Sequence, residues 1–340
     1  MTYRFRPLAL TGPERPAKAL PLAGGPLWFD RVEVLSRHAA PRIIAADQVS
    51  PEVLTRLTAP RAPVAGLDMG RVQIMGILNV TPDSFTDGGQ FDAPAAALDH
   101  ARLMQEQGAD LIDVGGESTR PGAVAVPPDQ ETARTAPVIA ALRAAGLGLP
   151  LSIDTRKAAV AQAAAQAGAD LVNDVSGFTF DAGLAPFCAG AGLPVCVMHA
   201  QGDPQTMQDD PRYDDVLLDV YDFLEARITA LEAAGIPRAR IIVDPGIGFG
   251  KTQAHNLALL ARIGVFHGLG CPILLGASRK KFIATLGQAS QIGDRVYGSV
   301  AVALAAVAQG VQILRVHDVF ATRSALTLWQ AATKGNTDVS

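Results

Sequence analysis

The feature that most constrains the fold of this chain is a phrase that recurs along it. A glycine precedes a short apolar run, and the run ends in polar residues: QGADLIDVGGES at 107–118, AGADLVNDVSG at 167–177 and QGVQILRVHD at 309–318. The glycine is typical of the left-handed residue that ends a helix. An apolar run without alternation is typical of a strand buried on both faces of a parallel sheet. The repeat therefore predicts alternating helices and parallel strands.

The number of these strands indicates the architecture. Ala- and Leu-rich stretches with helical periodicity separate most of them. Eight strand–helix units in about 250 residues are the size of a (β/α)8, or TIM, barrel. A doubly wound open sheet is the alternative, but no glycine-rich dinucleotide turn follows the first strand. The eight runs are QIMGILN, DLIDVG, LSIDT, LVNDV, VCVMH, IIVDP, ILLGAS and ILRVH.

The first 66 residues differ from the rest, because they hold 9 of the 23 prolines and so disfavour long helices. We expect an accessory segment at 1–66, the barrel at 67–332 and a polar tail at 333–340. Within the accessory segment, Ser50 and Pro51 suit the start of a short helix. The run PLWFDRVEVLSR suits a strand, and a hairpin around Asp68–Gly70 would lead into the first barrel strand.

The composition excludes several classes of protein. The net charge of −4 and the pI near 5.9 argue against nucleic-acid or anionic-membrane binding through bulk charge. The N-terminus lacks the continuous apolar core of a signal peptide, and no apolar run is long enough for a membrane span. Three scattered cysteines suit free, buried thiols, and we expect a cytoplasmic protein.

Polar residues follow every predicted strand, at the end of a barrel where reactions occur. Asp154, Asn173 and Asp244 follow the third, fourth and sixth strands. Two carboxylates and an amide suit a flat, nitrogen-rich heterocycle with several N–H donors. They also suit a hard cation, although Asp-x-Asp ligand spacing is missing. Each aspartate alone could simply cap the start of a helix.

Basic residues follow the last two strands, where barrels commonly bind phosphate. Lys280, Arg315 and His317 together indicate an anion site, although each alone is more often part of a surface ion pair. His317 could instead act as a general base. The first two loops, rich in Gly, Pro, Ser and Thr, suit lids, and their charged or polar residues Asp87, Thr119 and Arg120 would close onto a charged ligand.

The stretch DPGIGFGKT at 244–252 raises a nucleotide-binding P-loop as a further reading. That motif needs a glycine four residues before its Gly-Lys pair, and Pro245 stands at that position. We therefore interpret the glycines as a place of close backbone approach at the end of the sixth strand.

Together these phrases resemble the dihydropteroate synthases of folate biosynthesis, from about Val72 to Val319. The eight strand-end motifs occur in the family's order: IMGILNVTPDSFTDGG, DVGGESTRPGA, SIDTRK, NDVSG, MHAQGDPQTMQ, DPGIGFGKT, GASRK and RVHDV. The resemblance implies condensation of 6-hydroxymethyl-7,8-dihydropterin diphosphate with p-aminobenzoate, giving 7,8-dihydropteroate and pyrophosphate. It also implies a homodimer with late barrel helices at the interface.

The resemblance also implies roles for individual residues. Asn79 would ligate Mg²⁺. The pterin would be held by Asp154, Asn173, Asp244 and Lys280, with Met198 packing against it. Arg315 and His317 would bind the diphosphate. Asp87 and Arg120 would belong to the closing loops. The p-aminobenzoate pocket would be lined by Thr119, Pro121, Phe249 and Lys281.

One position departs from the family pattern. Many relatives have serine after Ser278-Arg279-Lys280, whereas this chain has Lys281, which could pair with the carboxylate of p-aminobenzoate or point to solvent. Three rival functions remain in view: a methyltetrahydrofolate methyltransferase on the same barrel, a pterin-binding paralogue without catalysis, and a Schiff-base aldolase using Lys280. The aldolase would need an apolar setting for its amine.

Overall fold

The centre of the molecule is a closed barrel of eight parallel strands. The computed structural model describes residues 2–81, 93–119, 122–203 and 205–336. The strands are hydrogen-bonded in the order β11-β10-β9-β8-β7-β6-β13-β12. A parallel bridge between Val243 and Ile273 joins the two ends of this order. The predicted (β/α)8 barrel is therefore confirmed, and the open doubly wound sheet was wrong.

The barrel strands coincide with the predicted apolar runs to within a few residues, the seventh being the shortest. They are β6 (Gln73–Asn79), β7 (Leu111–Gly115), β8 (Leu151–Asp154), β9 (Leu171–Asp174), β10 (Val195–Met198), β11 (Ile241–Asp244), β12 (Leu274–Leu275) and β13 (Ile313–Val316).

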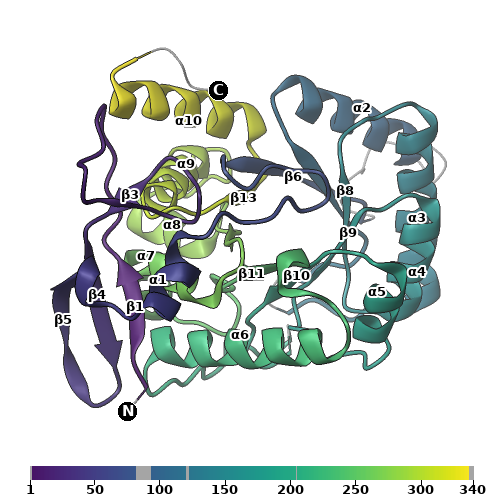
Figure 1. The fold of residues 1–340 in the computed structure, drawn as a ribbon. Coiled ribbons are helices and arrows are strands. Elements are labelled where there is room, and N and C mark those ends of the chain that lie inside the picture. Colours follow the sequence, from purple (N-terminus) through teal and green to yellow (C-terminus); the bar gives the residue numbers. More distant parts are fainter. Residues whose placement is uncertain (1, 82–92, 120–121, 204, 337–340) are drawn as a thin grey trace.

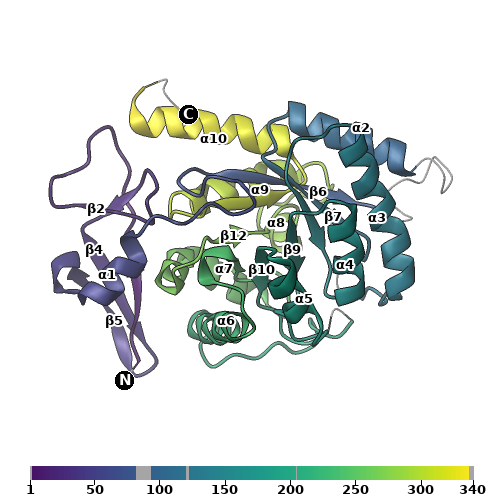
Figure 2. The same cartoon turned by 45° about the vertical axis from the view of Figure 1, so that its right-hand side comes forward.

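Helices surround the barrel, and α2 to α5 cover the side that lies on the right in both views (Figures 1 and 2). Gly168 ends α4 and Gly310 precedes β13 with positive φ, as the recurring phrase predicted. The helices are α2 (Ala93–Glu106), α3 (Pro128–Ala144), α4 (Ala158–Ala167), α5 (Leu184–Ala191), α6 (Val216–Ala233), η3 (Arg238–Arg240), α7 (Gln253–Ala261), η4 (Ile263–Leu269), α8 (Lys281–Leu286), α9 (Arg295–Val307) and α10 (Val319–Lys334). No helix in these described ranges is long and apolar enough to cross a membrane.

The accessory segment packs on one side of the barrel, away from α3 and α4 (Figures 1 and 2). It contains an antiparallel sheet, β1-β4-β5, and a two-stranded ribbon, β2-β3. Its elements are β1 (Arg4–Pro7), β2 (Leu20–Pro21), β3 (Trp28–Phe29), β4 (Arg31–Ser36), β5 (Ala39–Ala45), η1 (Ala46–Gln48) and α1 (Pro51–Thr58).

The sequence predictions for this segment hold in part. Helix α1 begins after Ser50 with Pro51 in its first turn, although the Ser50 side chain makes no capping bond. The single strand expected at 26–37 was wrong, because Asp30 separates β3 from β4. The hairpin was also misplaced: its antiparallel bridge joins Val64 to Leu67, so the chain reverses at 65–66 rather than at Asp68–Gly70.

Ion pairs attach the accessory segment to the barrel. Arg4 donates to Asp222 at 2.7 Å and to Glu225 at 2.7 Å, both on α6. Glu33 accepts from Arg6 at 2.6 Å and lies 3.3 Å from Arg262, beside the start of η4. Because Arg4 and Glu33 are largely buried, these pairs are screened less than surface pairs.

Candidate active site

Inward-facing side chains change from apolar to polar along the barrel strands. An apolar layer at their amino ends contains Leu111, Leu171, Cys196, Ile242, Leu274 and Ile313. Side chains alternate along a strand, so the residues two positions later face the same interior. These are Asp113, Asn173, Met198, Asp244, Gly276 and Arg315. The apolar layer closes the barrel below, and the polar layer is the floor of a site open at the carboxyl ends of the strands.

Arg315 connects two carboxylates in this floor. Its Nε donates to Asp113 Oδ2 at 2.6 Å, and its Nη2 donates to Asp154 Oδ2 at 2.7 Å. Asn173 Nδ2 donates to the same Asp113 oxygen at 3.1 Å. The structure thus brings together three predicted residues, Asp154, Asn173 and Arg315. It places Arg315 against the predicted pterin floor, and its predicted role in binding the diphosphate stays a prediction.

Asp113 is a candidate site residue that the sequence interpretation missed. It is fully buried, and its Oδ1 has no hydrogen-bond partner within the described residues. A buried carboxylate oxygen without a partner is costly unless a ligand satisfies it. The available signal was a charged residue inside the apolar run LIDVG. Asp113 comes two positions after Leu111, so both side chains face the interior of the barrel.

Burial shifts the pKa values of both predicted aspartates upward. Burial raises the pKa of Asp154 to about 7, with Arg315 opposing the shift and Asp113 adding to it. Burial also raises the pKa of Asp244, while the hydrogen bond from the Gly246 amide opposes the shift. Both side chains are nevertheless held among positive groups, and each can accept N–H donors from a bound heterocycle once ionised.

The turn after β11 lies close to its neighbours at two glycines. Gly246 has φ +69°, and a Cβ there would lie 1.8 Å from the His199 carbonyl oxygen. Its amide donates to Asp244 Oδ1 at 2.7 Å. A Cβ on Gly248 would lie 2.9 Å from Cδ of Lys280. The predicted close backbone approach is confirmed, and it positions Asp244 beside Met198, which is buried at the end of β10.

Lys280 and Phe249 face each other across this turn. The Lys280 ammonium lies 4.3 Å from the centroid of the Phe249 ring and also donates to the Ile247 carbonyl. Burial lowers the pKa of Lys280 to about 8, with Asp244 opposing that shift. The two predicted residues are therefore neighbours, and the lysine retains a positive charge at neutral pH.

Lys251 does not act as a P-loop lysine. Its side chain is buried, and Nζ donates to the carbonyls of Gly246 at 2.9 Å and Phe249 at 3.0 Å. It also lies 2.8 Å from Nδ1 of His199. Burial lowers its pKa well below the usual value. The amine holds the turn closed from inside and is not available to a nucleotide.

His317 lies next to Ser278. The Ser278 hydroxyl oxygen is 3.0 Å from His317 Nδ1 and accepts a hydrogen bond from the backbone amide of His317 at 3.2 Å. Arg279, between Ser278 and Lys280, donates to Asp318 at 2.9 Å. The residues after β12 and β13 are thus linked to one another. His317 is half-buried, beside the end of the strand that carries Arg315.

Asn79 ends β6 and lies over Gly115, where a Cβ would be 3.6 Å from Asn79 Oδ1 and 3.7 Å from Cβ of Asp154. Within the described residues, the side-chain amide of Asn79 makes no hydrogen bond. One neutral oxygen suits a magnesium ion that arrives with substrate phosphates and keeps several waters. The described part of the chain holds no group of three His, Cys, Asp or Glu that could bind a metal.

A buried ionic cluster anchors the second loop to the barrel. Lys157 Nζ donates to Glu117 at 2.8 Å, to the Val126 carbonyl at 2.7 Å and to Glu131. Arg156 donates to the same Glu117 at 3.2 Å. The sequence prediction gave no role to these charged residues. The available signal was that Glu117, Arg156 and Lys157 follow directly after two of the predicted strands.

The remaining predicted residues fall outside this polar floor. Asp87, Arg120 and Pro121 lie outside the described residues. Thr119 is half-buried at the start of the second loop. Lys281 opens α8, is exposed, and within the described residues its ammonium has no partner.

The barrel and its polar strand ends define a pterin-binding barrel enzyme. The sequence profile of the pterin-binding enzymes matches residues 75–317. The chain is 45% identical over 267 residues to dihydropteroate synthase of Escherichia coli K12, covering 78% of this chain and 93% of that protein. It belongs to the dihydropteroate synthase family.

Solved structures agree with this membership. Xanthomonas albilineans dihydropteroate synthase with 4-aminobenzoic acid is 48% identical with a TM-score of 0.75, covering 80% of this chain and 98% of that chain. The same organism's enzyme in complex with 7,8-dihydropteroate is 44% identical with a TM-score of 0.72, covering 80% and 98%. The matched family region begins after the accessory segment.

Proposed function

We propose that this chain condenses 6-hydroxymethyl-7,8-dihydropterin diphosphate with p-aminobenzoate, giving 7,8-dihydropteroate and pyrophosphate. The observation that carries the proposal is the buried floor in which Arg315 links Asp113 and Asp154 beside Asn173. It offers carboxylate and amide oxygens to the N–H groups of a pterin. The solved relatives with 4-aminobenzoic acid and with 7,8-dihydropteroate support the choice of substrates.

Charge placement accounts for the reaction. Breaking the C–O bond of the substrate leaves a cationic pterin methylene and a diphosphate anion. Asp154 and Asp244 lie where they favour the positive charge on the ring, and Lys280, Arg315 and His317 favour the departing anion. The aniline nitrogen attacks the methylene carbon with its lone pair, forming the C–N bond and an anilinium ion. Because that anilinium ion is strongly acidic, it gives its extra proton to water, and no general base from the protein is needed.

The second substrate enters beside the pterin. Phe249, in contact with Lys280, forms an aromatic wall for the p-aminobenzoate ring. Lys281 is exposed at the start of α8, where its charge attracts the carboxylate of that substrate. Thr119 and Pro121 in the p-aminobenzoate pocket, and Asp87 and Arg120 in closing loops, stay predictions from the sequence.

Asn79 would hold Mg²⁺ with the oxygens of the diphosphate. Bound there, the ion would neutralise the charge that develops on the leaving group. Gly115 leaves the space between Asn79 and Asp154 free of a side chain, which supports this position.

The protein would work as a cytoplasmic homodimer. Its three cysteines are free and buried, in keeping with a reducing compartment. Leu286, Ile292 and Tyr297, on α8, before α9 and on α9, are exposed to 52%, 58% and 79%. Large apolar side chains gathered over one region are typical of a protein interface.

One incubation tests the reaction. The protein is mixed with dihydropterin diphosphate, p-aminobenzoate and Mg²⁺, and mass spectrometry follows dihydropteroate and pyrophosphate, with a chelator in the control. We expect both products only when the metal is present. Asp154→Ala and Arg315→Ala should each abolish turnover while the circular dichroism spectrum stays unchanged. Pterin binding without product would favour the non-catalytic paralogue, and methyl transfer from methyltetrahydrofolate would favour the methyltransferase.

A further inference from the structure

A pocket lies at the opposite end of the barrel from the polar floor. Its volume is about 230 Å³, and it is enclosed by the accessory segment, by α10 and by the residues leading into two barrel strands. Gly70 to Val72 precede β6, and Gly310 to Gln312 precede β13. The pocket therefore faces the amino ends of the strands, whereas Asp154 and Asp244 stand at the carboxyl ends.

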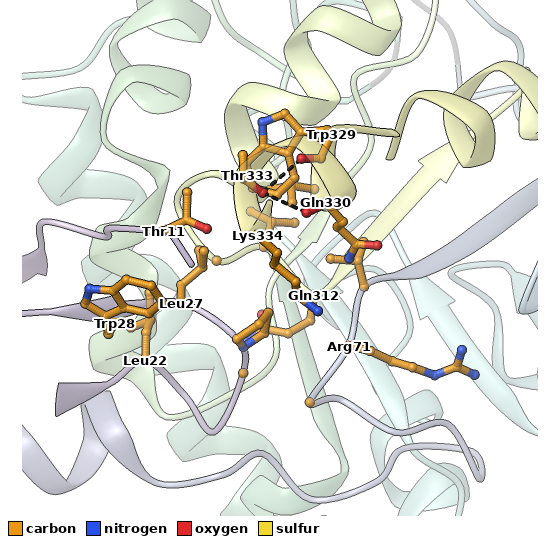
Figure 3. A pocket seen from close by; sticks show the side chains of 18 of the residues that line it. Thr11, Leu22, Leu27, Trp28, Arg71, Gln312, Trp329, Gln330, Thr333 and Lys334 are labelled. Carbon is orange, nitrogen blue, oxygen red and sulfur yellow. Dashed lines mark hydrogen bonds between the residues drawn. The ribbon is translucent and has the colours of Figure 1, made fainter. Parts of the chain in front are cut away.

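Two tryptophans flank this pocket. Figure 3 shows Trp28, from β3, and Trp329, from α10, on different sides of it, with Leu27 and Leu22 beside Trp28. Trp28 is buried and Trp329 is half-buried. Within the described residues, neither indole N–H makes a hydrogen bond. Small-molecule sites are mostly apolar and aromatic with a few polar groups, and this lining has that composition.

The charge of the lining is positive. Lys334 and Arg71 are its basic residues, and the described residues that line the pocket include no aspartate or glutamate. Figure 3 shows the Lys334 side chain extending between Trp329 and Gln312, whereas Arg71 points away from the centre. Arg71 lies 3.8 Å from Asp110. The charge inside the pocket therefore comes from Lys334.

Two other polar side chains of the lining are already engaged. Gln312 accepts from the Ile273 amide at 2.9 Å, and Thr333 donates its proton to the carbonyls of Trp329 and Gln330. The Lys334 ammonium has no ion-pair or hydrogen-bond partner within the described residues. The Lys334 ammonium is therefore the group that can form an ion pair with a negatively charged ligand.

We propose that this pocket binds a small aromatic carboxylate, with its ring between Trp28 and Trp329 and its carboxylate on Lys334. A cavity of about 150 Å³ in another protein holds one benzene ring, so about 230 Å³ leaves room for a ring and a short acidic chain. Stacking against indole rings favours an aromatic body, and the lysine favours the anion. The accessory segment supplies one wall of this site and lies before the matched family region.

The two tryptophans are the only ones in the chain, and both line this pocket, so their emission reports on it directly. The probe is 3-phenylpropionate, which does not absorb at the wavelength that excites tryptophan, and its uncharged match is 3-phenylpropanamide. We expect a saturable change of tryptophan emission with the acid, and about tenfold weaker binding of the amide because it cannot pair with Lys334.

Two variants test whether Lys334 supplies the positive charge that the ligand recognises. In Lys334→Gln the acid and the amide should bind equally, whereas Lys18→Gln, at an exposed lysine outside the pocket, should keep the tenfold difference. Binding of the probe at the strand ends would leave the emission unchanged, because neither tryptophan lies there. Absence of a saturable change overturns the proposal, and so does a preference for the acid that persists in Lys334→Gln. Both variants should form dihydropteroate at the wild-type rate.

Discussion

Asp113 holds Arg315 within the polar floor, through a 2.6 Å hydrogen bond between Oδ2 and Nε. Arg315 in turn reaches Asp154 with Nη2, so the orientation of one guanidinium depends on a carboxylate that sits deeper in the barrel. Asp113 therefore positions Arg315 and, through it, Asp154, the residues that we propose to contact the pterin.

Replacing Asp113 with Asn should weaken pterin binding by about 10- to 100-fold, since a hydrogen bond to a charged group contributes about 1.5–3 kcal/mol. Calorimetric titration with 6-hydroxymethyl-7,8-dihydropterin measures the change. Asp110→Asn is the matched control, because Asp110 precedes the same strand and accepts from the Ile74 amide at its other end. Its pterin affinity should stay within about twofold of the wild-type value. Equal losses in both variants would contradict a positioning role for Asp113.

The affinity for the pterin should be highest between about pH 7 and pH 8 and should fall on an acidic and an alkaline limb. Below pH 7 protonation of Asp154, whose pKa is raised to about 7, removes an acceptor, so affinity falls as the pH falls. Above pH 8 Lys280, whose pKa is lowered to about 8, loses its charge, so affinity falls as the pH rises. Titration with 6-hydroxymethyl-7,8-dihydropterin avoids the ionisation of the diphosphate. Lys280→Arg should remove the alkaline limb, because arginine stays charged; a limb that remains would belong to another group.

Replacing Lys251 with Met should lower the free energy of unfolding by about 2 kcal/mol, because buried carbonyl groups lose their donor. Urea denaturation measures this loss. Lys281→Met provides the comparison, since Lys281 is exposed and surface substitutions usually stay within about 0.5 kcal/mol. A Lys251→Met protein as stable as the Lys281 variant would show that the internal bonds of the amine contribute little.

Charge reversal in Lys281→Glu should raise the KM for p-aminobenzoate several-fold, because the new side-chain carboxylate would repel the carboxylate of the substrate. Steady-state kinetics with saturating pterin substrate measures the effect, and the KM for the pterin should not change. Lys334→Glu, at the opposite end of the barrel, should leave both constants unaltered. An unchanged p-aminobenzoate KM in Lys281→Glu would mean that this side chain only faces solvent.

Tyr297→Glu should convert the proposed dimer into a monomer, since a charge in the centre of an apolar interface is strongly unfavourable. Light scattering after size exclusion distinguishes a 35.4 kDa chain from its dimer. Leu103→Glu alters a side chain that is 48% exposed on α2, which is not one of the late helices, and should remain dimeric. Loss of the dimer in both variants would contradict an interface formed by the late helices.

The barrel could be predicted from the sequence because its signals are local. Each apolar run with its flanking glycine specifies a buried strand, and QIMGILN coincides with β6 residue for residue. Asp154, Asn173 and Asp244 could be predicted because they stand at the ends of those runs. Asp113 also faces the barrel interior, but it lies in the middle of its strand. Because polar residues at strand ends were the signal for the site, Asp113 was not predicted.

The rest depends on contacts between distant parts of the chain. The short β12 and the division of the accessory strand at Asp30 follow from packing rather than propensity. The pairing of Lys157 with Glu117 and Glu131 requires the loop after β7 and the first turn of α3 to meet the residues that follow β8. The pocket between Trp28 and Trp329 exists only after the accessory segment has docked, so no local pattern indicates it.

The ion pairs of the accessory segment also impose an order on biosynthesis. Arg4 and its partner Asp222 are 218 residues apart, so the segment leaves the ribosome long before α6 does. At 5–20 residues per second this interval is roughly 10–40 seconds. Throughout that time β1 and β4 have no barrel to pack against. Docking of the first-made segment is therefore a late event, and during synthesis its apolar residues are candidates for protection by chaperones.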